Sequence, residues 1–184
     1  MGEQRGKRRF DPERRQRIID AALETILTYG VCGTTHRRIA AAADVPLGSM
    51  TYHFDGLEDL LCQAFTQLAE RSSAEVLKRL SAAQSRKEAL EAVVDIIASN
   101  VWSTPQTLLL SYELYAFAAR KPELITVMQH WMSRSREALG RHFDPLTARA
   151  LDALIEGIGI HNSVDQRPLT REEIFRIVHR LALN

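Results

Sequence analysis

The chain has 184 residues, of which 45% are hydrophobic and 26% are charged, and its formal net charge is +1. This composition is typical of a globular protein with one or two domains and argues against a disordered chain. It contains no apolar run near the roughly 18 residues of a membrane-spanning helix, and no apolar stretch behind the basic N-terminus that would mark a secretory signal.

The cysteine content adds to this picture. Cys32 and Cys62 are the only cysteines, and they form neither a disulfide framework nor a metal-ligand pattern. We therefore expect reduced thiols in a cytoplasmic protein, with no metal site, no cofactor and no membrane partner.

The positive charge is concentrated at the N-terminal end. Residues 1–54 contain nine Lys or Arg and six Asp or Glu, a balance of +3, so the remainder carries −2. A basic end on a near-neutral body favours a surface that binds a polyanion. For residues 1–9, a solvated tail is an equally good interpretation.

Helix signals run along the whole chain, without an alternating strand pattern or an internal repeat. The first helix is predicted to start at Asp11, as cap, and Pro12, in its first turn. Its apolar stripe includes Ile19 and Ile26, and Gly30 is placed to end it in the left-handed conformation.

Two short helices come next, and neither is long enough to be stable alone. Thr34 or Thr35 can cap the first, which runs to about Ala43. A tight turn at residues 44–46 follows, because a residue before proline avoids the helical region. The second short helix is predicted from Leu47 to Phe54.

From Leu57 onward the pattern predicts long helices. Proline stands at or near most of the breaks between them, as is common where helices begin. The predicted ranges after the helix at Leu57 are 86–102, 106–120, 123–142, 145–163 and 171–182. We therefore expect an all-α fold of about nine helices, divided into residues 1–56 and residues 57–184.

Residues 33–54 predict a helix, a turn and a second helix that are packed together through Ile39, Ala40, Val45 and Met50. A helix that reads the major groove needs short side chains near its start and phosphate ligands beside them. The short groove-facing candidates are Leu47, Gly48, Ser49 and Thr51. The candidate phosphate ligands are Thr35, His36, Arg37, Tyr52 and His53. The alternative for Tyr52 is a plain core aromatic and that for His53 is an ordinary surface histidine, while Phe54 is expected in the core.

These residues form a motif that resembles the DNA-binding domain of the TetR family of bacterial repressors. The resemblance rests on an Arg-rich start, Ile-Ile-x-Ala-Ala-Leu, Thr-Thr-x-Arg-x-Ile-Ala and Tyr-His-Phe, in that order. It implies an N-terminal three-helix DNA-binding domain, followed by a C-terminal bundle that senses a ligand and forms a dimer. It also implies that Arg37 contacts bases or nearby phosphate, and that Tyr52 and His53 touch the DNA backbone.

Several positions depart from the pattern of the family. Asp44 stands where the turn usually has glycine, and Pro46 removes the usual side-chain cap of the second short helix. Gly56 and Leu57 replace a frequent Ser-Lys pair, so a phosphate-binding lysine is missing. These departures affect the base preference more than the binding mode.

The C-terminal part contains most of the apolar residues. Gly157 and Gly159 interrupt an apolar helix, which suggests close approach of another backbone. With the resemblance, this predicts a dimer interface at Leu151, Leu154, Ile155, Ile158, Ile174, Ile177, Val178 and Leu181, although packing within one subunit is the alternative. The candidate ligand pocket contains Asn100, Trp102, Tyr112, Glu113, Tyr115, Phe117, Met128, Trp131, His161 and Asn162. Most of these could equally be core residues.

The predicted function is a transcriptional regulator of the repressor type that binds a palindromic operator as a homodimer and is released by a small-molecule effector. The alternatives are an activator of the same fold and a helical module that binds another protein. An enzyme is not expected, because no phosphate loop, metal-ligand spacing or nucleophile–base set is present. His161 and Asp165 are four residues apart, but one such pair is a weak signal.

Overall fold

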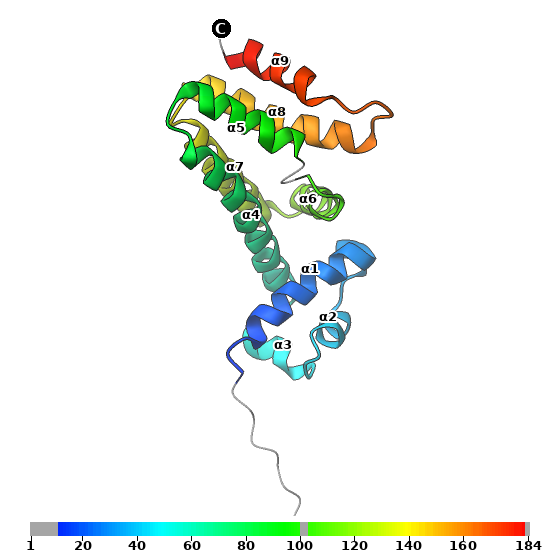
Figure 1. The fold of residues 1–184 in the computed structure, drawn as a ribbon. Helices are drawn as coiled ribbons and strands as arrows, with labels where there is room; N and C mark the ends of the chain where they lie inside the picture. The colour runs from blue at the N-terminus through cyan, green and yellow to red at the C-terminus, as the bar shows by residue number, and fades with distance from the viewer. Residues whose placement is uncertain (1–10, 100–102, 183–184) are drawn as a thin grey trace, which may run out of the picture. The chain divides into compact units, whose positions relative to one another are not determined.

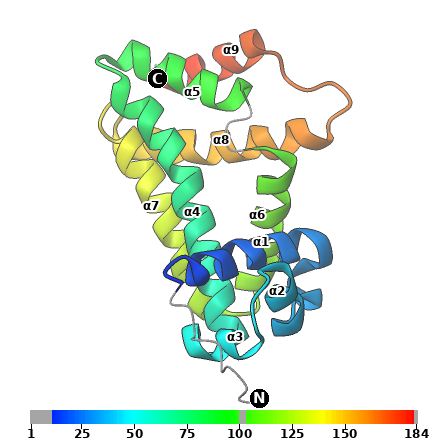
Figure 2. The same ribbon diagram turned by 60° about the horizontal axis from the view of Figure 1, so that its bottom comes forward.

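The computed structural model describes residues 11–99 and 103–182, and every regular element in these ranges is helical (Figures 1 and 2). The predicted all-α class is therefore confirmed. The chain forms two compact units, Met1–Ala64 and Phe65–Asn184, and the division falls inside the helix that begins at Leu57. Among the described residues, no helix is long and apolar enough to cross a membrane.

The N-terminal unit contains α1 (Arg14–Gly33), α2 (His36–Ala42), α3 (Gly48–His53) and the start of α4 (Leu57–Ala82). The helix α1 begins two residues later than predicted. Pro12 and Glu13 form a turn instead, in which the Asp11 carboxylate accepts the N–H of Glu13 at 3.1 Å. A break does occur at Gly30, where φ is 67° and ψ is 170°, but one further helical turn follows it.

The core of the N-terminal unit holds α1, α2 and α3 together. Ile18 and Ile26 of α1, Ile39 of α2 and Met50 of α3 are at most 1% exposed, and α2 packs against both α1 and α3. The predicted packing through Ile39, Ala40 and Met50 is confirmed, and Val45 is partly buried. Because α2 and α3 have seven and six residues, this burial is what keeps them helical.

The C-terminal unit continues from α4 through five further α-helices. One difference from the prediction lies at α5, which ends at Ala98. Another lies after Pro122, where a single 3₁₀ turn precedes α7 because proline lacks the N–H and favours a helix start. The elements are α5 (Arg86–Ala98), α6 (Pro105–Ala118), η1 (Pro122–Leu124), α7 (Ile125–Leu139), α8 (Pro145–Val164) and α9 (Arg171–Ala182).

The helices α5, α8 and α9 pack against one another, and α7 packs on α8 (Figure 1). One continuous hydrophobic cluster fills this part of the unit. Its largest fully buried side chains include Leu80, Ile96, Ile97 and Leu139. The cluster fixes the position of α8, which carries several of the candidate pocket and dimer residues.

The start of α8 offers a test based on pH. The Asp144 carboxylate accepts the N–H groups of Leu146 and Thr147 at 3.0 and 3.1 Å, and the Thr147 hydroxyl at 2.5 Å. The Thr147 hydroxyl and N–H bonds hold the pKa of Asp144 below its ordinary value of 3.8. A carboxyl with a lowered folded pKa stabilises the protein fully above its unfolded pKa, and this contribution is lost as the pH falls through the folded value.

Asp144→Asn keeps a capping oxygen but does not titrate. We expect wild type to have a higher free energy of unfolding than Asp144→Asn from about pH 7 to about pH 5, and the difference to vanish in acid. Urea denaturation of both proteins across this pH series measures it. A difference that persists unchanged into acid would contradict the role of the carboxylate charge.

Candidate nucleic-acid interface and cavities

The turn between α2 and α3 adopts an uncommon backbone conformation. Asp44 has a φ of 51°, the left-handed region in which glycine is the usual residue and aspartate is tolerated. The N–H of Val45 then donates to the Ala40 carbonyl at 3.0 Å, which closes the turn. The departure noted at Asp44 is thus accommodated without glycine.

The two short helices begin differently. Thr35 caps α2, because its hydroxyl accepts the N–H of Arg38 at 3.3 Å. The helix α3 has Leu47 at its cap position and no side-chain acceptor there, as the proline at residue 46 predicts. The N–H groups of Ser49 and Met50 donate to the backbone carbonyls of Pro46 and Leu47, at 2.8 and 3.1 Å, so the start of α3 is held by the turn itself.

All nine residues predicted to contact DNA are exposed or partly exposed. Tyr52 is 82% exposed and Leu47 is 48% exposed, whereas Phe54 is only 4% exposed and belongs to the core, as predicted. Arg37 is exposed and makes no ion pair or hydrogen bond within the described part of the chain. The Tyr52 ring meets the His53 ring edge to face at 4.8 Å between centroids.

Arg38 has a different environment from its neighbour Arg37. Its guanidinium lies over the Tyr29 ring, 4.1 Å from the centroid, and donates to the Gly33 carbonyl. A Cβ at Gly33 would approach the Tyr29 Cβ to 2.9 Å, so this position requires glycine. Arg38 therefore fastens the end of α1 to α2 and positions the side chains of α2.

A second set of contacts holds the end of α3. Arg15 lies over the Phe54 ring at 5.5 Å and also donates to Gln63 of α4. The Asp59 carboxylate accepts the N–H of Asp55 at 3.0 Å and the Gln63 amide at 2.8 Å. These contacts join α1, the residues that follow α3 and the start of α4 within the N-terminal unit.

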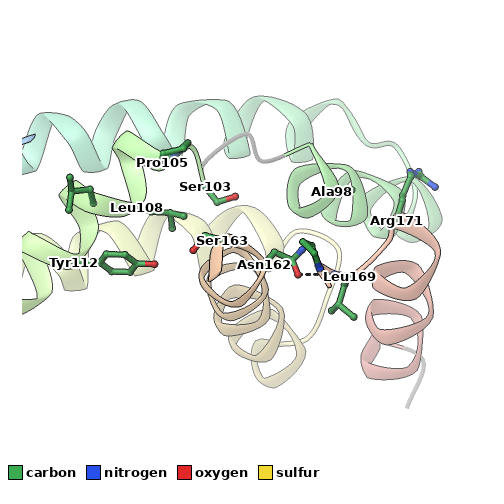
Figure 3. Close-up of a pocket in the computed structure, with 11 residues that line it drawn as sticks. Ala98, Ser103, Pro105, Leu108, Tyr112, Asn162, Ser163, Leu169 and Arg171 are labelled. Atoms are coloured by element: carbon green, nitrogen blue, oxygen red, sulfur yellow. Dashed lines mark hydrogen bonds between the residues drawn. The ribbon is translucent and has the colours of Figure 1, made fainter. Parts of the chain in front are cut away.

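Two of the predicted pocket residues line one cavity of about 550 Å³ in the C-terminal unit (Figure 3). They are Tyr112 of α6, which extends toward the end of α8, and Asn162 of α8, whose side-chain oxygen accepts the N–H of Leu169 at 2.9 Å. Most other lining residues are apolar, and Arg171 at the rim forms ion pairs with Glu91 and Asp95. The volume lies within the usual range for small-molecule sites.

The other predicted pocket residues do not gather in this cavity. Tyr115, Met128, Trp131 and Glu113 lie on α6 and α7 with partly or largely exposed side chains, and His161 is exposed. The Phe117 ring packs against Phe65 at 6.5 Å between centroids. Asn100 and Trp102 lie outside the described residues.

Trp131 lines a second, smaller cavity of about 50 Å³ between α4, α7 and α8. Two acidic residues of α8 also line it, Asp152 and Glu156. The Tyr115 hydroxyl donates to Glu156 at 2.7 Å, across 41 residues of sequence. Neither acidic residue is among the sequence candidates, since only the arrangement of α4, α7 and α8 brings them beside Trp131.

The residues predicted at the dimer interface fall into two groups. Leu151, Ile155, Ile158, Ile174 and Val178 are at most 7% exposed and belong to the subunit's own hydrophobic cluster. Leu154, Ile177 and Leu181 are at least partly exposed. Most of the residues predicted at the dimer interface are therefore buried within their own subunit. Another subunit can reach only the exposed side chains of α8 and α9.

Comparison with known proteins covers both units. Residues 18–64 match the family described as bacterial regulatory proteins, tetR family, and residues 84–183 match the tetracyclin repressor-like C-terminal domain. The HTH-type transcriptional regulator BetI of Agrobacterium fabrum is 27% identical in an alignment of 168 positions that covers 87% of this chain and 82% of that protein.

Two solved structures are more similar in sequence. A protein described as a transcriptional regulator from Streptomyces coelicolor A3(2) is 43% identical, with a TM-score of 0.89 over 94% of this chain and 100% of that one. The multidrug binding protein EbrR, in complex with ethidium, is 36% identical, with a TM-score of 0.77 over 94% of this chain and 99% of that one.

Proposed function

Because this chain belongs to the TetR family of bacterial transcriptional regulators, we propose that it is a cytoplasmic repressor that binds a palindromic operator as a homodimer. A small molecule bound in the C-terminal unit releases it from DNA. The α2–α3 surface is the DNA-binding element, and the C-terminal unit senses the ligand and forms the dimer. The observation that carries the proposal is the set of exposed polar side chains around α3.

The side chains of this surface divide by the contacts that they can make. Leu47, Gly48, Ser49 and Thr51 lie at the start and on the first turn of α3, where side chains reach base edges. Tyr52 is 82% exposed, so its ring and hydroxyl are accessible to a partner such as the DNA backbone. Arg37, which has no partner within the described residues, supplies a free positive charge beside them.

The glycine at position 48 is explained better by contact with DNA than by packing within the subunit. A Cβ at Gly48 would meet nothing within 4 Å, so no contact within the subunit requires glycine there. Glycine also weakens a short helix. Close approach of the α3 backbone to a base pair accounts for both features.

The proposed dimer face is a stripe of small and apolar residues along α8, which we define as Leu146, Ala150, Ala153, Gly157, Ile160 and Val164. Their spacing alternates between three and four residues, which places them on one side of a helix. Leu146 and Val164 are 77% and 78% exposed. A Cβ at Gly157 would meet nothing within 4 Å, so a neighbouring helix of a second subunit explains this glycine. Leu154, Ile177 and Leu181 complete the accessible apolar surface of α8 and α9.

The effector part of the proposal rests on the cavities of the C-terminal unit and on a relative. EbrR, described as a multidrug binding protein, has been solved in complex with ethidium, malachite green and proflavin. In this chain Tyr112 and Asn162 line the larger cavity, and Trp131 lines the smaller one. A ligand there releases DNA only if it binds more tightly to the conformation that fits the operator poorly.

Selection of bound duplexes from a random DNA pool tests the proposal. We expect a palindrome with two half-sites and an affinity that falls steeply with salt, by about 0.9 log unit per log unit of salt for each phosphate neutralised. If no sequence is enriched, or if binding is insensitive to salt, the assignment of α3 as a reading helix is wrong. A protein–protein module is then the better description.

A further inference from the structure

The smaller cavity combines an aromatic wall with an unneutralised negative charge. It is formed by α4, α7 and α8, and its lining includes Trp131, Asp152, Glu156 and small hydroxyl side chains such as Ser72 and Ser135. All of these side chains belong to the C-terminal unit.

The two carboxylates of the cavity have different partners. Asp152 forms an ion pair with Arg136 at 2.8 Å, so its charge is compensated. Glu156 accepts a hydrogen bond from the neutral Tyr115 hydroxyl, and it makes no ion pair within the described ranges. The net charge of Asp152, Arg136 and Glu156 together is therefore −1, and it is carried by Glu156.

The Tyr115 hydroxyl lies close to the same two carboxylates, and its pKa is affected by them. Burial, the hydrogen bond to Glu156 and the charges of Glu156 and Asp152 together raise the pKa of the Tyr115 hydroxyl well above its ordinary value, against an opposing effect of Arg136.

We propose that this cavity binds the positively charged head group of an organic ammonium ion, between the Glu156 carboxylate and the Trp131 ring. Tryptophan is the strongest of the aromatic side chains in cation–π contacts, and quaternary ammonium groups are the ligands that aromatic sites of this kind recognise. The carboxylate supplies the counter-charge that the ring cannot. The volume, about 50 Å³, suits a head group, while the partly exposed lining lets the rest of the ligand extend outward.

Binding of the cation does not depend on the proposed function, whereas any effect of the cation on DNA binding rests on it. The larger cavity has the opposite chemistry. Its one charged lining residue, Arg171, is neutralised by Glu91 and Asp95, which favours an uncharged ligand there. The two cavities can therefore be distinguished by the charge of a probe.

The test uses two probes of the same shape, phenyltrimethylammonium and its uncharged carbon analogue tert-butylbenzene. Calorimetric titration of the full-length protein is expected to show binding of the ammonium ion and at least about tenfold weaker binding of tert-butylbenzene. Glu156→Gln keeps the side-chain shape and removes the charge, so we expect it to weaken ammonium binding by about tenfold or more. Glu137→Gln, an exposed acidic position on α7, is the matched control and is expected to bind as wild type does.

The aromatic wall is tested separately with Trp131→Phe and Trp131→Leu. The ammonium affinity is expected to fall in that order, since phenylalanine keeps a weaker π-face and leucine keeps none. Circular dichroism of each variant verifies that the helical fold is retained.

Three results would overturn the inference. They are equal affinity for both probes, no effect of Glu156→Gln, or binding that is lost instead on Tyr112→Phe or Asn162→Ala in the larger cavity. Operator binding without any probe is measured in parallel. Its failure would reject the proposed function alone, whereas normal operator binding without ammonium binding would reject only the cation site.

Discussion

Arg37→Ala is expected to weaken operator binding by about 1–3 kcal/mol for each half-site and to relax the base preference at the position that Arg37 contacts. Arg37 is exposed and unpaired in the described structure, so its replacement leaves a DNA contact unmade without disturbing the fold. Competition titrations with the selected operator and its single-base variants measure both effects.

The matched control is Arg120→Ala, which removes the same charge from an exposed position at the end of α6. It is expected to change neither the affinity nor the base preference. If Arg37→Ala weakens all sequences equally and lowers the salt slope, Arg37 contacts phosphate rather than a base. If it behaves as Arg120→Ala does, Arg37 does not contact DNA.

Tyr52→Ala gives the contrast within the same surface. A side chain that is 82% exposed contributes little to the subunit, so the free energy of unfolding should change by less than about 0.5 kcal/mol. We expect weaker binding of every sequence with an unchanged preference, because a phosphate contact positions the helix but carries no base information. A changed preference would instead place the Tyr52 ring in the groove.

The second large effect is expected at Gly157, where a bulky side chain should separate the proposed dimer while the subunit stays folded. The space around a Cβ at this position is empty within one subunit, and leucine favours a helix more than glycine does by about 1 kcal/mol. Against a partner helix the same side chain overpacks the contact, at about 1–3 kcal/mol for each of the two symmetric copies. Gly157→Leu is therefore expected to raise the dimer dissociation constant at least about tenfold.

Sedimentation measurements over a range of protein concentrations determine that constant, and Leu151→Ala is the contrasting variant on the same helix. Leu151 is 0% exposed in the subunit core, so we expect Leu151→Ala to lower the free energy of unfolding by about 2–5 kcal/mol. A Gly157→Leu protein that dimerises as tightly as wild type would reject the proposed face. A Leu151→Ala protein with wild-type stability would contradict the packing of α8.

Much of the N-terminal unit could be predicted from local sequence patterns. The residues that cap, turn and break helices act within a few positions of themselves, as with Thr35, Asp44 and Gly30. The apolar spacing then indicates which face is buried, and Ile39 and Met50 are buried as expected. The family resemblance rests on the same short-range motif, which is why the all-α class and the regulatory family follow from the sequence.

In the C-terminal unit, the accessible apolar residues and the lining of the smaller cavity could not be predicted from local sequence patterns, because both depend on tertiary contacts. An apolar stripe shows that a helix face is covered but not by what, and five of the eight predicted dimer residues are buried in the hydrophobic cluster of their own subunit. Glu156 of α8 meets Tyr115 of α6 across 41 residues of sequence, and the difference between Glu156 and Asp152 depends on where Arg136 lies. The sequence by itself therefore determined the elements and the DNA-reading motif, since those interactions span a few residues. Which carboxylate is left without a counter-charge, and which apolar residues remain accessible, were decided by contacts between residues far apart in the chain.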